Sequence, residues 1–244
     1  MHPLLPALQK GLDGLGLSLT DDQQTQLLAY MDLIGKWTKV YNLTAVRDAN
    51  EMLTHHLLDS LAVIAPLRRE LAKLPMQVTS TNTEMGVEAG VGTVNAAEQG
   101  AAKTTQPKFS LLDVGAGAGL PGIVIAIVCP EVSVTCVDTV AKKAAFIQQV
   151  AATLKLPNLK GLHARVESLT QPFDVVCSRA FASLLDFTTW SKSALASHGV
   201  WMAMKGKHPD LELAVLPESV KVFHVEQLQV PGLDAERCII WMRG

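Results

Sequence analysis

The strongest chemical signal in the chain is a glycine-rich segment between two apolar runs. Glycines stand at positions 115, 117, 119 and 122 within LLDVGAGAGLPG, and the last three alone satisfy the pattern GxGxxG. Glycine has no Cβ atom, so the backbone can turn sharply there and approach a ligand closely. The segment follows a predicted strand at 109–114 and precedes a predicted helix at 120–129. In that position the pattern predicts a loop that holds a nucleoside cofactor.

An acidic residue two positions before Gly115 bears on the choice of nucleoside. A dinucleotide places its pyrophosphate on a helix N-terminus, where a neighbouring carboxylate opposes it. S-adenosylmethionine has no phosphate but carries an ammonium and a sulfonium, so the carboxylate of Asp113 favours it. We therefore expect Asp113 and the glycine loop to bind S-adenosylmethionine rather than NAD.

Polar side chains also follow the next three predicted strands, at the edge of the sheet where ligands bind in this type of fold. Asp138 ends the second strand. It is placed to accept hydrogen bonds from both ribose hydroxyls, or to cap the following helix. After the third strand, Val166 is placed to pack on the adenine and Glu167 to read its edge, with an exposed loop acid as the equal alternative. Arg179 leaves an apolar strand, so it must form an ion pair or bind a carboxylate or phosphate.

A small basic group is predicted at the same edge of the sheet. It comprises Arg68, Arg69, Arg165, Arg179, Lys205 and Lys207. Because the net charge is −2, the chain has no broadly basic coat for nucleic acid, and an RNA partner would have to meet a local patch. These side chains form either a phosphate-binding lip or a solvated edge.

The helical first part of the chain contributes further candidates. Asn42 and Thr44 are polar residues in an apolar setting and are placed to shape a substrate pocket. His55 and His56 are adjacent, so they point to different faces of a helix and do not share a metal. We expect a structural hydrogen bond between His55 and Asp59, which are four residues apart. No cysteine–histidine spacing typical of zinc is present, and no metal is predicted.

The elements that position these residues fall into three regions. Residues 1–75 are predicted to be helical, with Thr20 as an N-cap and Gln23 as its capping-box partner. Residues 76–108 are rich in Thr, Gly and Ala without a period, which predicts a flexible insertion. Residues 109–244 alternate between strands and helices and end in an antiparallel pair at 220–225 and 238–242. The prediction is an α/β Rossmann-like fold: a mostly parallel seven-stranded sheet with helices on both faces and an N-terminal helical extension.

Composition limits the class of protein. The chain is 48% hydrophobic and 18% charged, enough for a substantial core. Its four cysteines form no CxxC pair and are expected to be reduced core residues. The longest apolar run, 123–129, is too short to cross a bilayer, and the N-terminus does not have the pattern of a signal peptide. We therefore expect a cytoplasmic protein that does not enter a membrane. A monomer is also expected, although none of these features determines the oligomeric state.

Several motifs in combination resemble one family. LLDVGAGAGLPGIVIAI, VTCVDTVAKKAAFIQQV, ARVES, FDVVCSRAFASL and AMKGK occur in this order after YNLTAV and HHLLDSL. Over nearly the whole chain except 76–108, they resemble the ribosomal RNA small subunit methyltransferase G family. The resemblance implies a class I S-adenosylmethionine-dependent methyltransferase. The implied reaction methylates N7 of a guanosine, nucleotide position 527 in the decoding region of 16S ribosomal RNA, as free RNA or in the small subunit.

The resemblance also implies site residues. Carried over by motif, cofactor contacts fall on Gly115, Leu120, Val166, Glu167 and Arg179, and the general fold adds Asp138. The catalytic group stays unassigned, and the candidates on the substrate side are Asn42, Arg165, Arg179 and Lys205.

The implied chemistry agrees with the residues present. Guanine N7 carries a lone pair and no proton, so methyl transfer needs positioning more than a general base. Three alternatives stay open at this point: an NAD-dependent oxidoreductase, a non-catalytic RNA-binding assembly factor, and a methyltransferase for another acceptor.

Overall fold

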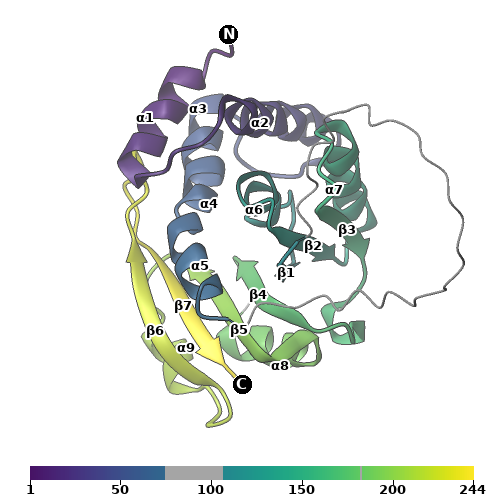
Figure 1. Ribbon diagram of the computed structural model, residues 1–244, viewed down its shortest axis with the longest axis vertical. Coiled ribbons are helices and arrows are strands. Elements are labelled where there is room, and N and C mark those ends of the chain that lie inside the picture. Colours follow the sequence, from purple (N-terminus) through teal and green to yellow (C-terminus); the bar gives the residue numbers. More distant parts are fainter. Residues whose placement is uncertain (75–106, 182) are drawn as a thin grey trace, which may run out of the picture.

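The structure, a computed structural model, describes residues 1–74, 107–181 and 183–244 (Figure 1). The predicted insertion at 76–108 therefore lies outside the described residues, apart from its last two. The first described region is helical, as predicted. Its elements are α1 (Leu5–Leu15), α2 (Asp21–Tyr41), α3 (Ala49–Met52), a π-helical segment (Leu53–Leu58), α4 (Asp59–Leu61) and α5 (Ile64–Leu71).

The second region is built on a seven-stranded sheet with the order β3-β2-β1-β4-β5-β7-β6. The strands are β1 (Phe109–Val114), β2 (Val132–Asp138), β3 (Leu159–His163), β4 (Phe173–Arg179), β5 (Leu195–Lys205), β6 (Lys221–Leu228) and β7 (Arg237–Arg243). The pairs among β1 to β5 are parallel, and β7 lies antiparallel to both β5 and β6. The predicted fold class and the final antiparallel pair are confirmed.

Side chains alternate between the two faces along each strand, so both faces of this sheet carry apolar side chains that must be buried. Helices cover both faces. They are α6 (Gly122–Val128), α7 (Ala141–Thr153), α8 (Leu184–Ser191) and α9 (Asp210–Ala214). Leu111 and Val175 belong to one buried cluster with the N-terminal helices, α6 and α7. Leu112 and Val176 belong to the other, with α8. Figure 1 shows α2, α6 and α7 on one side of the sheet and α8 and α9 on the other.

Three predicted helices differ in extent from the observed ones. The helix predicted over 140–156 is α7, which ends at Thr153. The helix predicted over 183–197 ends at Ser191, because Leu195 pairs with Phe173 and begins strand β5 there. The single helix predicted over 51–66 is interrupted by the π-helical segment, a local change of winding that apolar periodicity does not register.

Helix α2 joins the helical region to the sheet by hydrogen bonds as well as by apolar packing. The predicted capping box of Thr20 and Gln23 is confirmed. The Gln23 amide also donates to the carbonyls of Ile127 and Val128, at the C-terminal end of α6. Further along α2, the buried Tyr30 hydroxyl donates to the Ala118 carbonyl at 2.6 Å. Helix α2 is therefore bonded both to the end of α6 and to the glycine loop that precedes it.

The Tyr30 bond predicts a stability effect. We expect Tyr30→Phe to lower the free energy of unfolding by about 1–3 kcal/mol, because the Ala118 carbonyl loses a buried donor. Urea denaturation followed by circular dichroism measures the change. Tyr41, the only other tyrosine in the sequence, lies at the exposed end of the same helix and supplies the matched variant Tyr41→Phe. Equal stability of the two variants would show that the Tyr30 hydroxyl contributes nothing.

Candidate functional site

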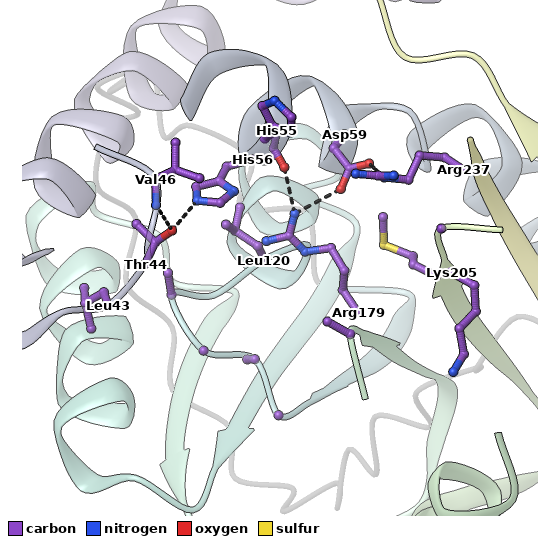
Figure 2. Close-up of a pocket in the computed structure, with 17 residues that line it drawn as sticks. Leu43, Thr44, Val46, His55, His56, Asp59, Leu120, Arg179, Lys205 and Arg237 are labelled. Atoms are coloured by element: carbon purple, nitrogen blue, oxygen red, sulfur yellow. Dashed lines mark hydrogen bonds and ion pairs between the residues drawn. The ribbon is translucent and has the colours of Figure 1, made fainter. Parts of the chain in front are cut away.

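A cavity of about 600 Å³ lies where the carboxyl ends of the strands meet the helical region (Figure 2). Its wall combines the segment after α2, the π-helical segment with α4, the glycine loop, and the ends of β4, β5 and β7. The lining residues are Leu43, Thr44, Val46, His55, His56, Asp59, Gly115, Ala116, Gly117, Ala118, Leu120, Arg179, Ala180, Met204, Lys205, Gly206 and Arg237. This is the position at which open α/β sheets bind ligands.

The glycine loop presents bare backbone to the cavity. Gly117 has a φ of +60°, and a Cβ atom added to it would have only the Gly115 carbonyl, 3.9 Å away, as a neighbour. Gly119 has a φ of +87°, and a Cβ there would collide with the Ile123 side chain. The first position is open toward a ligand and the second is closed by packing. The loop therefore fits the close approach of a cofactor that its pattern predicts.

Asp113 lies behind this loop and does not line the cavity, contrary to the expected contact with a cationic cofactor. Its side chain is fully buried, and its Oδ2 accepts the Gly122 N–H at 2.8 Å. Burial raises the pKa of this carboxyl from 3.8 to about 7, against the opposing effects of that hydrogen bond and of Arg179. Because Asp113 caps the start of α6, it supports the loop rather than contacting what the loop holds.

The residues predicted for the ribose and adenine also lie outside this cavity. The carboxylate of Asp138 accepts the N–H groups of Gly117 at 3.0 Å and Val140 at 2.8 Å, so it bonds the glycine loop and the residue before α7. The capping of α7 given as its alternative is not seen, because Val140 is the N-cap residue of α7 and no side chain among the described residues caps that helix. Val166 is buried in the cluster on the opposite face of the sheet. Arg165 and Glu167 are exposed beside it. None of these residues lines the cavity.

Arg179 and Lys205 do line the cavity, as predicted. Arg179 Nη1 donates to Asp59 Oδ2 at 3.0 Å and to the His55 carbonyl at 3.1 Å. Lys205 forms an ion pair with Glu212 at 2.8 Å, and its ammonium points away from Arg179 (Figure 2). Each of these two cations is therefore paired with a carboxylate, and Arg179 is held in addition by a backbone carbonyl, which fixes its direction.

The sequence reasoning missed one member of this site, Arg237, and gave Asp59 the wrong partner. Arg237 Nε donates to Asp59 Oδ1 at 2.8 Å. The expected bond between His55 and Asp59 is wrong, because the Asp59 oxygens bind guanidinium groups, which form stronger charge-assisted bonds. A signal for Arg237 was present. Arg237 begins β7, which is antiparallel to β5. The start of β7 therefore lies at the edge of the sheet where the parallel strands end.

The segment after α2 contributes Thr44 rather than Asn42. Asn42 ends α2 with a φ of +50°, and its side chain accepts a hydrogen bond from Arg47 at 2.7 Å on the exposed side. The expected pocket role of Asn42 is therefore not seen. Thr44 Oγ1 lies 2.6 Å from His56 Nε2, and both side chains line the cavity (Figure 2). Burial and the nearby Arg179 lower the pKa of His56 below 6.5, so near neutral pH its ring is uncharged.

The predicted basic lip is smaller than expected. Arg68 donates to the Val128 carbonyl at the far end of α6, and Arg69 pairs with Glu226 on β6. Neither lines the cavity, because these contacts hold both side chains elsewhere. Lys207 lines a second cavity of about 770 Å³, which shares Gly206 and Arg237 with the first.

Other expectations concern metals, cysteines and membranes. Among the described residues, no group of three or more His, Cys, Asp or Glu side chains is placed to hold a metal ion. All four cysteines are free and buried, as predicted. No helix in the described ranges has the length and apolar character required to cross a membrane.

Comparison with known proteins gives one consistent family. The sequence pattern described as "rRNA small subunit methyltransferase G" matches residues 23–74 and 97–240. A protein named ribosomal RNA small subunit methyltransferase G from Polaromonas sp. (strain JS666 / ATCC BAA-500) is 67% identical over 236 residues, covering 97% of this chain and 92% of its own. A protein of the same name from Albidiferax ferrireducens is 61% identical over 243 residues, covering 100% and 98%.

A solved structure is similar at a lower level. A SAM-dependent methyltransferase from Aquifex aeolicus matches 56% of this chain and 82% of its own, with 16% identity and a TM-score of 0.46. The family assignment rests on the sequence relatives.

The buried Asp113 carboxyl predicts a pH dependence of stability. Its folded pKa of about 7 exceeds the ordinary value of 3.8, so protonation stabilises the fold. This contribution is complete below about pH 4 and is lost as the pH rises through about 7. We expect Asp113→Asn to gain roughly 2–4 kcal/mol relative to the unsubstituted protein between pH 4 and pH 8. Urea unfolding across this range measures it, and a constant difference between the two proteins would contradict the burial argument.

Proposed function

This chain belongs to the rRNA small subunit methyltransferase G family, and we propose that it methylates N7 of a guanosine, nucleotide position 527, in 16S ribosomal RNA. It is an S-adenosylmethionine-dependent methyltransferase of 16S ribosomal RNA. The family relationship does not favour an NAD-dependent oxidoreductase or a non-catalytic assembly factor. The observation that carries the proposal is the cavity in which a bare glycine backbone faces a fixed arginine.

The residues of the cavity suit this reaction. When bound, the cofactor supplies a methyl group on a positively charged sulfur, and the C–S electron pair returns to sulfur as the base nitrogen forms the new bond. Guanine N7 carries no proton, so the protein need not remove one. The remaining task is to align donor and acceptor, and rigidly held side chains perform it.

His56 contributes to the electrostatics of the cavity. Methylation at N7 leaves the base cationic, and a positive neighbour would oppose that charge. His56 is uncharged near neutral pH because burial lowers its pKa, and Thr44 holds its ring at 2.6 Å. An uncharged histidine beside the acceptor is compatible with the cationic product.

We assign the two sides of the glycine loop to two parts of the cofactor. Gly115, Leu120 and Arg179 line the cavity and are proposed to bind the methionine portion. Asp138, Val166 and Glu167 follow β2 and β3 and are proposed to bind the ribose and adenine across the loop. Asp113 supports the loop through Gly122 without contacting the cofactor.

The substrate side and the wider setting are also proposals. Lys205 and Arg179 face the RNA from the cavity, and Arg165 reaches it from the rim. The methyltransferase region is 109–244, and the helical region 1–75 forms the facing wall. The chain acts as a monomer in the cytoplasm, where four buried free thiols suit a reducing environment.

Arg179 supplies the first test of this site. We expect Arg179→Ala to lower kcat/KM for methyl transfer by about 100-fold or more, because a fixed donor to the ligand is removed. The fold should survive, since Asp59 keeps Arg237 as its partner. Arg243, at the other end of β7 over the Phe223 ring, gives the matched control Arg243→Ala. Near-wild-type turnover by Arg179→Ala would remove Arg179 from the site.

The acceptor is tested by mapping the methyl group. Tritiated S-adenosylmethionine is supplied with undermodified small subunits and, separately, with free 16S ribosomal RNA. We expect label on N7 of the guanosine at position 527, located by chemical cleavage at methylated guanine and by mass spectrometry of nuclease fragments. Label on another base or another atom would overturn the proposed acceptor, and the two substrates together show whether an assembled particle is required.

A further inference from the structure

One buried carboxylate holds two arginines at the wall of the cavity. The side chain of Asp59 on α4 is only 3% exposed. Its Oδ2 accepts Arg179 Nη1 at 3.0 Å, and its Oδ1 accepts Arg237 Nε at 2.8 Å. Arg179 ends β4 and Arg237 begins β7, so this cluster joins three distant segments at one point (Figure 2).

The cluster has an excess of positive charge on its open side. The side chains of Arg179 and Arg237 are 21% and 23% exposed, and both line the cavity. One carboxylate neutralises one of the two guanidiniums. Among the described residues, Nε and Nη2 of Arg179 and Nη2 of Arg237 have no hydrogen-bond partner. These donors are available to an anionic oxygen in the cavity.

The backbone beneath the cluster is shaped to fix one of these guanidiniums. In a regular α-helix the Asp59 N–H would bond to the His55 carbonyl, four residues earlier. Here it is directed at the carbonyls of Thr54 and His56, because this turn is π-helical. The His55 carbonyl is left for Arg179 Nη1, at 3.1 Å. Arg179 is therefore held both by a carboxylate and by a carbonyl.

We infer that Asp59 is a positioning residue for methyl transfer, which holds Arg179 and Arg237 so that their free N–H groups bind an anionic oxygen in the cavity. That oxygen belongs to the carboxylate of the cofactor or to a phosphate of the RNA. Asp59 does not touch the reacting atoms, because both its oxygens are already bonded to arginine. This inference rests on the proposed function.

The burial of the cluster argues for a role beyond stability. A buried ion pair recovers little more than the cost of removing its charges from water, and apolar residues of similar size are often as stabilising. Asp59 fixes two partly exposed guanidiniums at a cavity. Its main effect is therefore to orient these two groups rather than to stabilise the fold. Arg237 also lines the second cavity, so its direction affects both.

The test uses Asp59→Asn in the full chain. Asparagine keeps the shape and one acceptor oxygen but turns an NH2 group toward the second guanidinium, so one arginine is released. We expect kcat/KM for methylation of undermodified small subunits to fall by at least about tenfold. Wild-type kcat/KM in this variant would overturn the inference, whereas an inactive wild-type protein would overturn the proposed function instead.

Two further measurements identify the anion. Calorimetric titration compares S-adenosylmethionine with decarboxylated S-adenosylmethionine. If the cofactor carboxylate is bound, the wild-type protein prefers the carboxylated form and Asp59→Asn reduces that preference at least about tenfold. If an RNA phosphate is bound, both titrations are unchanged and the KM for the subunit rises by a similar factor. Either result supports the positioning role of Asp59. If neither the cofactor preference nor the KM for the subunit changes in Asp59→Asn, the inference is overturned.

A matched variant separates positioning from stability. Asp174 on β4 is another buried carboxylate, 1% exposed, and accepts hydrogen bonds from Ser110 away from the cavity. Asp174→Asn should keep wild-type kcat/KM at temperatures where both variants are folded by circular dichroism. A loss of activity that follows the loss of stability equally in both variants would overturn the inference. If Asp59→Asn does not fold, Arg237→Lys, which keeps the charge but not the planar fork, must give the same shift in preference or KM.

Discussion

The site depends on a glycine loop that leaves its front open because its back is hydrogen-bonded. A buried backbone polar group needs a partner, and a loop that faces a ligand cannot find all its partners within itself. Asp113 bonds the loop at Gly122 and Asp138 bonds it at Gly117. Tyr30 completes the set from a helix that lies far away in the sequence. The loop keeps its left-handed turns because residues of β1, β2 and α2 all hold it.

This arrangement explains why the helical region is part of the site. Its apolar residues share one buried cluster with one face of the sheet, so the two regions pack without a separate interface. The π-helical segment and α4 then place His56 and Asp59 over the ends of the strands. The sheet supplies the loop and Arg179, and the helical region supplies the opposing wall. Neither region alone encloses the cavity.

The sequence predicts the features that depend on the spacing of residues within a short segment. Alternating strands and helices, the loop between β1 and α6, and the capping box of Thr20 all follow from residue spacing. Pairings between distant segments do not: nothing near Asp59 in the sequence indicates Arg237, 178 positions later. Asp113 shows a different limit. A carboxylate beside a glycine loop suggests an attraction for cations, but strand geometry turns this one toward the start of α6 and buries it.

The position of β7 has a consequence for how the protein is made. This strand follows all the others along the sequence, yet it lies inside the sheet, between β5 and β6. It also carries Arg237, the second partner of Asp59. During synthesis every other wall of the cavity is translated first, and Asp59 has only Arg179 until β7 leaves the ribosome and inserts. A nascent chain that stops short of β7 therefore has the glycine loop but lacks Arg237, the part of the cavity wall that β7 contributes.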